Sequence, residues 1–129
     1  MKNNLTLTIL SLLSIALVLF HVADDIRIGV SPPGLSNLIL IAIAVVWLYG
    51  TLTLAGRTSG YIIILLGSML GTVIPVIHMS GPNGMVGPHL TKAGGIFFFV
   101  WTNLALGVTC VYSALLAARG LRGPRSNHS

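Results

Sequence analysis

Four long apolar segments limit the fold of this 129-residue chain more than any other feature. They cover about residues 5–22, 35–55, 61–79 and 95–118, and each approaches the roughly 20 residues that a helix needs to cross a bilayer. Backbone polar groups inside a bilayer must be satisfied within the segment, so helices are expected. The sequence therefore predicts an all-α membrane protein: a four-transmembrane-helix bundle forming one domain over residues 1–119.

The composition supports a lipid environment. Hydrophobic residues make up 54% of the chain and charged residues only 7%, whereas roughly a quarter of a soluble domain is charged. The basic residues are scattered at segment ends, which argues against nucleic-acid binding. The expected partners are the lipid bilayer and either another membrane protein or a second copy of the chain. Cys110 is the single cysteine, so no intramolecular disulfide can form, and we expect it to be a packing residue.

The distribution of basic residues predicts the orientation, because cytoplasmic loops are enriched in Lys and Arg. An N-in/C-in arrangement places five basic residues inside and two outside, with residues 120–129 as a short basic cytoplasmic tail. The inner set is Lys2, Arg57, Arg119, Arg122 and Arg125, and the outer set is Arg27 and Lys92. We expect an integral protein of the plasma (inner) membrane whose chain crosses the bilayer several times.

The first segment also has to be distinguished from a cleaved signal peptide. Its apolar run is longer than the roughly 7–15 residues of a signal core. His21 also occupies the position at which a small residue should precede Ala23. We therefore expect this segment to be retained as the first helix.

Small and polar residues recur at spacings of three and four, which predicts the helix-packing faces. Helices in a bilayer associate through close backbone approach and hydrogen bonds, so such stripes should face the bundle interior. Asn103 lies near the middle of its segment, and we expect an interhelical hydrogen bond there, with a substrate contact as the alternative. The predicted packing residues are Ser11, Ser14, Gly67, Gly71, Pro75, Asn103 and Gly107.

A cluster of potential ligands is predicted at the outer end of the bundle. The first and third segments run in the same direction, so His21 and His78 should lie at similar depth. Asp24 and Asp25 follow His21 at the i+3 and i+4 positions, on the same helix face. His89, in the loop before the fourth segment, can fold over the same place.

The predicted cluster has several interpretations. The first is a set of solvated residues paired locally at the membrane surface. The second is a metal site, because mixed nitrogen and oxygen donors suit Zn²⁺, Fe²⁺, Cu²⁺ or Mn²⁺. A His–carboxylate proton switch is the third. Axial ligation of haem by His21 and His78 is the least favoured, because nothing else in the sequence marks a haem pocket.

Three functions follow from these patterns. The first is an accessory or binding protein with an outward-facing His/Asp polar cap. The second is a metal-binding, or metal-dependent, membrane protein that uses His21, Asp24, Asp25 and His78. The third is a small dimeric transporter of the four-helix multidrug type. Such transporters rely on an acidic residue within the first helix. The only polar residues of this segment before His21 are Ser and Thr. No residue is predicted to be catalytic, which favours binding over enzymatic activity.

Overall fold

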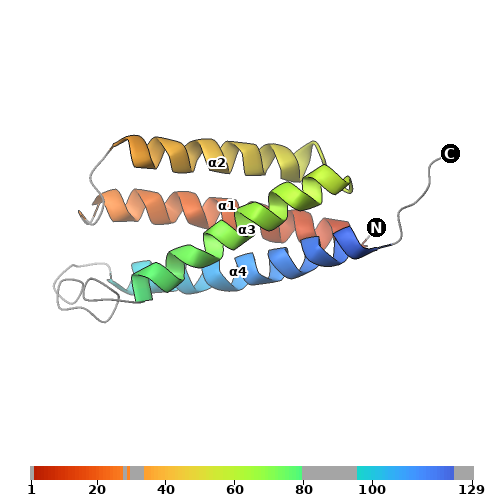
Figure 1. The fold of residues 1–129 in the computed structure, drawn as a ribbon. Coiled ribbons are helices and arrows are strands. Elements are labelled where there is room, and N and C mark those ends of the chain that lie inside the picture. The colour runs from red at the N-terminus through yellow and green to blue at the C-terminus, as the bar shows by residue number, and fades with distance from the viewer. Residues whose placement is uncertain (1, 28, 30–33, 80–95, 124–129) are drawn as a thin grey trace.

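The computed structural model describes residues 2–27, 29, 34–79 and 96–123. All the regular structure in these residues is helical, and each of four helices is long and apolar enough to cross a membrane. The predicted number and type of elements are therefore confirmed. The helices are α1 (Lys2–Arg27), α2 (Leu35–Leu52), α3 (Thr58–Met79) and α4 (Ile96–Arg122) (Figure 1).

The helix ends differ from the apolar boundaries of the sequence. α1 continues through the polar residues to Arg27, because Arg27 pairs with Asp24 one turn earlier. α4 runs to Arg122, so the start of the predicted tail is helical. Gly120 faces the ring of Tyr61, where an added Cβ would overlap the ring, and packing thus extends beyond the apolar run.

The α2–α3 connection is a short turn that begins earlier than predicted. α2 ends at Leu52, after which the Thr53 backbone N–H donates to the Tyr49 carbonyl. Gly56 then adopts a φ of 77°, a left-handed conformation that glycine reaches without steric cost. The chain reverses within a few residues, which places α3 beside α2.

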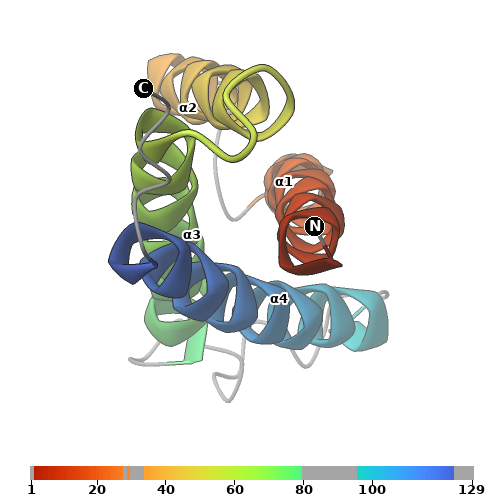
Figure 2. The ribbon, with the colours of Figure 1, turned by 90° about the vertical axis from the view of Figure 1, so that its right-hand side faces the viewer.

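The helices are arranged around α1. Viewed along the bundle, α2, α3 and α4 surround α1 on three sides (Figure 2). α3 crosses from α2 to α4 and packs most extensively on α4, while α1 packs mainly on α4 and α2. α1 and α3 touch little. The start of α1 and the end of α4 lie at the same end of the bundle (Figure 1).

Close approach of small residues and a polar network hold the interior together. Gly67 lies against the Trp47 ring and Gly71 against the Cys110 sulfur. The indole Nε1 of Trp47 donates to Ser11 Oγ over 2.8 Å. The residues predicted to mediate packing lie as follows: Ser11, Ser14, Gly67, Gly71, Pro75 and Asn103 are buried, and Gly107 is half-buried beside Pro75.

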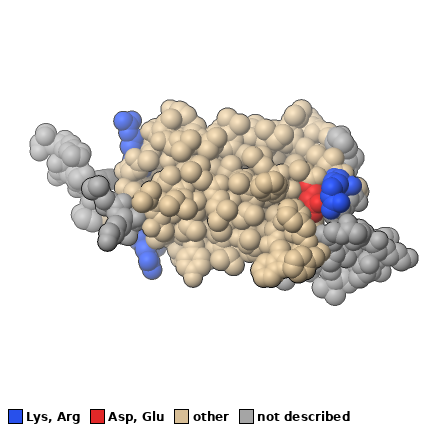
Figure 3. Space-filling view, turned by 180° about the vertical axis from the view of Figure 1, so that it is seen from behind, with Lys and Arg blue, Asp and Glu red and all other residues tan. Residues whose placement is uncertain are grey.

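The surface is apolar along the bundle and charged at its two ends. Figure 3 shows basic groups at one end, an acidic and a basic group together at the other, and an uncharged surface between them. Large hydrophobic side chains are exposed on all four helices. Such an apolar surface is far larger than a soluble monomer normally exposes, so it suits a lipid environment.

Candidate functional site

Two helices bring a carboxylate and two imidazoles together at one end of the bundle. His21 and Asp25 are four residues apart on α1 and therefore share a face. His78 lies one residue before the end of α3. Asp25 Oδ2 faces both rings, at 3.3 Å from His21 Nε2 and 3.5 Å from His78 Nε2. A single carboxylate oxygen thus links the two histidines across the α1–α3 contact.

The three side chains are largely shielded from the surroundings. His21 is 3% exposed and Asp25 is 9% exposed, while His78 is half-buried. The imidazole centroids are 4.6 Å apart with the rings at 70° to each other. Phe99 of α4 packs its ring against both, at centroid distances of 5.7 Å from His21 and 5.4 Å from His78. The cluster therefore has an aromatic wall on the α4 side.

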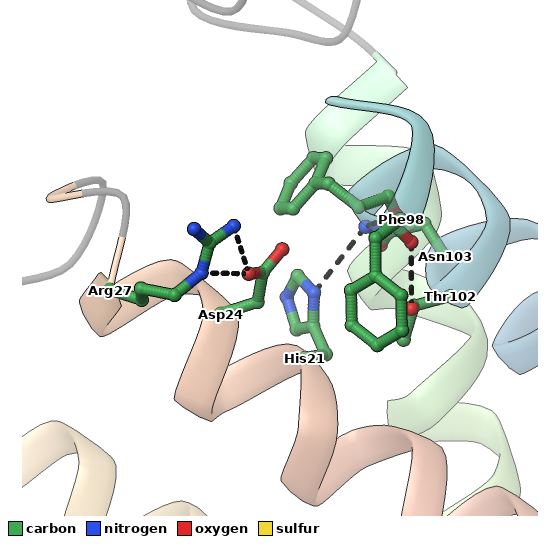
Figure 4. A network of polar contacts seen from close by, with 7 residues as sticks. His21, Asp24, Arg27, Phe98, Thr102 and Asn103 are labelled. Atoms are coloured by element: carbon green, nitrogen blue, oxygen red, sulfur yellow. Dashed lines mark hydrogen bonds and ion pairs between the residues drawn. The ribbon is translucent and has the colours of Figure 1, made fainter. Parts of the chain in front are cut away.

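Asn103 of α4 approaches His21 from the opposite ring nitrogen. Its Nδ2 lies 3.4 Å from His21 Nδ1 and donates to the Phe99 carbonyl at 3.0 Å (Figure 4). The expected interhelical contact of Asn103 is thus made with a histidine of the cluster. The other amide atom, Asn103 Oδ1, is buried and has no hydrogen-bond partner among the described residues, and the same is true of Asp25 Oδ1.

The unpartnered oxygen of Asp25, a member of the cluster, bears on which ligands the site favours. A buried acceptor without a donor costs free energy, about 1–3 kcal/mol for a neutral group and more for a charged one. A cation, or a group that donates hydrogen bonds, would relieve that cost, whereas an anion would add to it. The electrostatics of the cluster therefore favour a positively charged ligand.

The structure describes four of the five ligands that the sequence pattern places together, and it separates one of them from the other three. His21, Asp25 and His78 converge, whereas Asp24 pairs with Arg27 (Figure 4). Both Arg27 Nε and Nη2 lie 2.8 Å from Asp24 Oδ1. His89 lies outside the described residues. Asp24 consequently contributes to an ion pair beside the cluster and contributes no atom to it.

Phe99 and the proximity of Asn103 to His21 were not predicted. Phe99 belongs to the run Phe97–Phe98–Phe99, in which composition alone does not distinguish one ring from the next. The usable signal is its spacing of four from Asn103, which places both residues on one face of α4. That face becomes informative only when the approach of α1 to α4 is known.

The cluster has the donor set of a metal site, and two of its donor separations match one. One ligand atom from each of His21, Asp25 and His78 lies within 4.8 Å of the others. Metal–ligand bonds of about 2.0–2.1 Å at tetrahedral angles place neighbouring ligand atoms about 3.3–3.4 Å apart. The two nitrogen–oxygen separations, 3.3 and 3.5 Å, match that spacing. The widest separation in the group is 4.8 Å, so a bound ion would draw the ligand atoms closer together. Haem does not fit between these imidazoles, because a macrocycle has no room between rings in edge contact.

Comparison with models of protein families, with curated proteins and with solved structures gives no match. The convergent residues themselves are therefore the basis for assigning a function.

Proposed function

We propose that this chain is a small multi-pass membrane protein that binds a divalent transition-metal ion through His21, Asp25 and His78. One observation carries the proposal: three ligand atoms from two helices converge within 4.8 Å in largely buried positions, with both nitrogen–oxygen separations close to those of a metal coordination sphere. Two imidazoles and one carboxylate suit Zn²⁺ or Fe²⁺ and leave further coordination positions open. A ligand held at this point would connect α1 to α3.

The local charges support a cation here. α1 and α3 both end at the cluster, and the C-terminus of each helix carries about half a negative charge. Asp25 adds a full negative charge beside these ends. Arg27 is already paired with Asp24, so it does not neutralise Asp25. A divalent cation would offset the carboxylate and both helix ends together.

The distribution of basic residues supports an orientation with both termini in the cytoplasm of a plasma (inner) membrane. In that orientation the cluster faces outward, where a metal ion from the outer aqueous phase reaches it. The role that fits best is binding in a single four-helix domain, as an accessory protein whose outer polar cap is the metal site. The positions left open by the three protein ligands then take water or a group from a partner.

Metal analysis of purified protein tests this function. The full chain is purified in detergent, loaded with Zn²⁺, freed of excess metal and analysed by mass spectrometry. We expect about one zinc ion per chain, as befits one three-ligand site, and its loss in His21→Ala and in His78→Ala. Asp24→Asn is the matched control, because Asp24 is adjacent to the cluster but pairs with Arg27. Protein without zinc, or zinc unaffected by both histidine substitutions, would overturn the proposal.

A further inference from the structure

A second polar feature lies on the outside of α1 and uses none of the three metal ligands. Phe20, Ala23, Asp24 and Arg27 of α1 line a surface pocket together with Phe98 of α4. Its volume of about 340 Å³ is at the lower end of the roughly 300–1,000 Å³ of small-molecule sites. The pocket therefore has the size of a binding site and carries one group of each charge.

The Asp24–Arg27 pair leaves hydrogen-bonding capacity unused. Arg27 directs both Nε and Nη2 to the same atom, Asp24 Oδ1. The Asp24 side chain is only 4% exposed, and its second oxygen, Oδ2, is buried and has no hydrogen-bond partner among the described residues. A guanidinium carries five N–H donors, and the Arg27 side chain is 56% exposed. The pocket thus presents guanidinium donors at its surface, beside a carboxylate of which one oxygen, Oδ2, is buried and without a partner among the described residues.

The position of the pocket indicates where its ligand comes from. An acidic and a basic group lie together at the edge of the uncharged surface (Figure 3), and Asp24 and Arg27 are such a pair. Phe20 and Phe98, which flank them, are 57% and 53% exposed on the apolar side. Polar groups at the border of an apolar belt meet lipid headgroups, while the aromatic rings lie beside the first part of the acyl chains.

We propose that this pocket binds the headgroup of an aminophospholipid, specifically phosphatidylethanolamine. The primary ammonium pairs with the Asp24 carboxylate, and the phosphate oxygens accept hydrogen bonds from the Arg27 guanidinium. The rings of Phe20 and Phe98 contact the ammonium methylene groups and the upper acyl chains. A zwitterion satisfies both protein charges at once, which no ligand of a single charge can do.

The chemistry predicts which lipids are rejected. Phosphatidylcholine has the same net charge, but its quaternary ammonium has no N–H to donate to the Asp24 carboxylate. The phosphate of phosphatidylglycerol can pair with Arg27. Its headgroup has no ammonium to offset that negative charge or to pair with Asp24. Soluble phosphoethanolamine has the correct charges and lacks the acyl chains that lie along the two phenyl rings. The order of affinity should therefore be phosphatidylethanolamine first, with the other three well below it.

Native mass spectrometry of the full chain in detergent, with equimolar lipids of identical acyl chains, tests the proposal. We expect about tenfold tighter binding of phosphatidylethanolamine than of phosphatidylcholine, the effect of one hydrogen bond to a charged group. Asp24→Asn should reduce that ratio to about one, with phosphatidylcholine binding as the internal check on folding. Ala23→Leu fills the pocket and leaves both charges in place, and it should also abolish the preference. Arg122→Gln, at the other end of the bundle, should leave it unchanged.

Four results would overturn the proposed lipid site. Equal binding of the two zwitterionic lipids by the unmodified chain, or phosphatidylglycerol binding as tightly as phosphatidylethanolamine, would overturn the proposal. A preference that survives both Asp24→Asn and Ala23→Leu would do so as well. Competition by millimolar soluble phosphoethanolamine would show that a free headgroup suffices and that the lipid is not the ligand. The proposal is independent of the metal site: His78→Ala should lose zinc and keep the lipid preference, and Asp24→Asn should do the reverse.

Discussion

His78 Nε2 lies 3.5 Å from Asp25 Oδ2, and this contact joins α3 to α1, two helices that otherwise touch little. On the other side of the same site, Asn103 of α4 approaches His21 Nδ1. Three helices therefore meet at one polar point near the end of the bundle. A ligand bound there would act as a cross-link between helices as well as occupying a site.

This arrangement predicts that metal binding stabilises the bundle. Saturating Zn²⁺ should raise the thermal unfolding temperature of the unmodified chain, because a ligand at about 100 times its dissociation constant adds about 2.7 kcal/mol to the free energy of unfolding. His78→Ala should abolish the shift, since only α1 ligands remain. Asp24→Asn should retain it. An equal shift in His78→Ala would show that zinc binds elsewhere.

Asn103 is expected to position His21 for metal binding. Its Nδ2 is 3.4 Å from His21 Nδ1, on the side of the ring away from Asp25. Loss of such an outer contact typically lowers metal affinity about 10–100-fold. Asn103→Ala should therefore weaken zinc affinity by that amount while one ion still binds at saturation, as isothermal titration would measure. Thr102→Ala is the control, because Thr102 bonds only to the Phe98 carbonyl in the described contacts.

Zinc affinity should also fall as the solution is acidified. An imidazole must lose its proton to bind metal, so protons compete with zinc at His21 and His78. Each imidazole that must release a proton lowers the affinity by up to about tenfold per pH unit, so the two together lower it by up to about a hundredfold. The charged groups nearby are Asp24, Asp25 and Arg27. Titrations at about pH 7.5 and pH 5.5 would measure the change, and equal affinities at both values would exclude imidazole ligation.

Much of the site could be predicted because helix geometry relates sequence spacing to position. The four-residue separation of His21 and Asp25 predicts a shared face, and the parallel direction of the first and third helices places His78 at the same level. The separation of Asp24 from Asp25 could not be predicted from this spacing, because positions i+3 and i+4 both lie near His21. The competing partner, Arg27, is visible in the sequence. It lies three residues after Asp24 and two after Asp25, and only the three-residue spacing shares a helix face, so Arg27 pairs with Asp24.

The packing faces show a similar limit. Positions in the stripes of small and polar residues, such as Ser11, Gly67 and Asn103, are buried. They do not show which helix each stripe meets. That depends on the crossing of α3 over α4 and on the indole of Trp47, whose length brings it to Ser11. Periodicity identifies the inner face of one helix, whereas pairing of faces requires all four helices together.

The Ser11 network should contribute measurably to stability. Thr51 Oγ1 donates its proton to the Trp47 carbonyl at 2.9 Å. Ser11 must therefore donate to Thr51, 2.7 Å away, while it accepts from Trp47 Nε1. Ser11→Ala leaves a buried indole N–H unpaired and should lower the free energy of unfolding by about 1–2 kcal/mol.

Denaturant titration in mixed micelles would measure the effect of Ser11→Ala. Ser36→Ala, at an exposed position on α2, is the matched control and should change stability by less than about 0.5 kcal/mol. Indistinguishable curves for the two variants would mean that the network adds nothing to stability.

Two glycines on neighbouring helices should respond in opposite ways to the same substitution. A Cβ on Gly67 would overlap the Trp47 ring, which the hydrogen bond from Nε1 to Ser11 keeps in place. Gly67→Ala should therefore destabilise the bundle by about 1–3 kcal/mol, the usual effect of overpacking. A Cβ on Gly107 would lie 3.5 Å from Pro75 Cγ, an ordinary contact. Gly107→Ala should be neutral or stabilising by up to about 1 kcal/mol, because alanine is the better helix former. Unfolding curves measured side by side would separate the two variants, and equal destabilisation would mean that burial alone, without the Trp47 contact, governs the response.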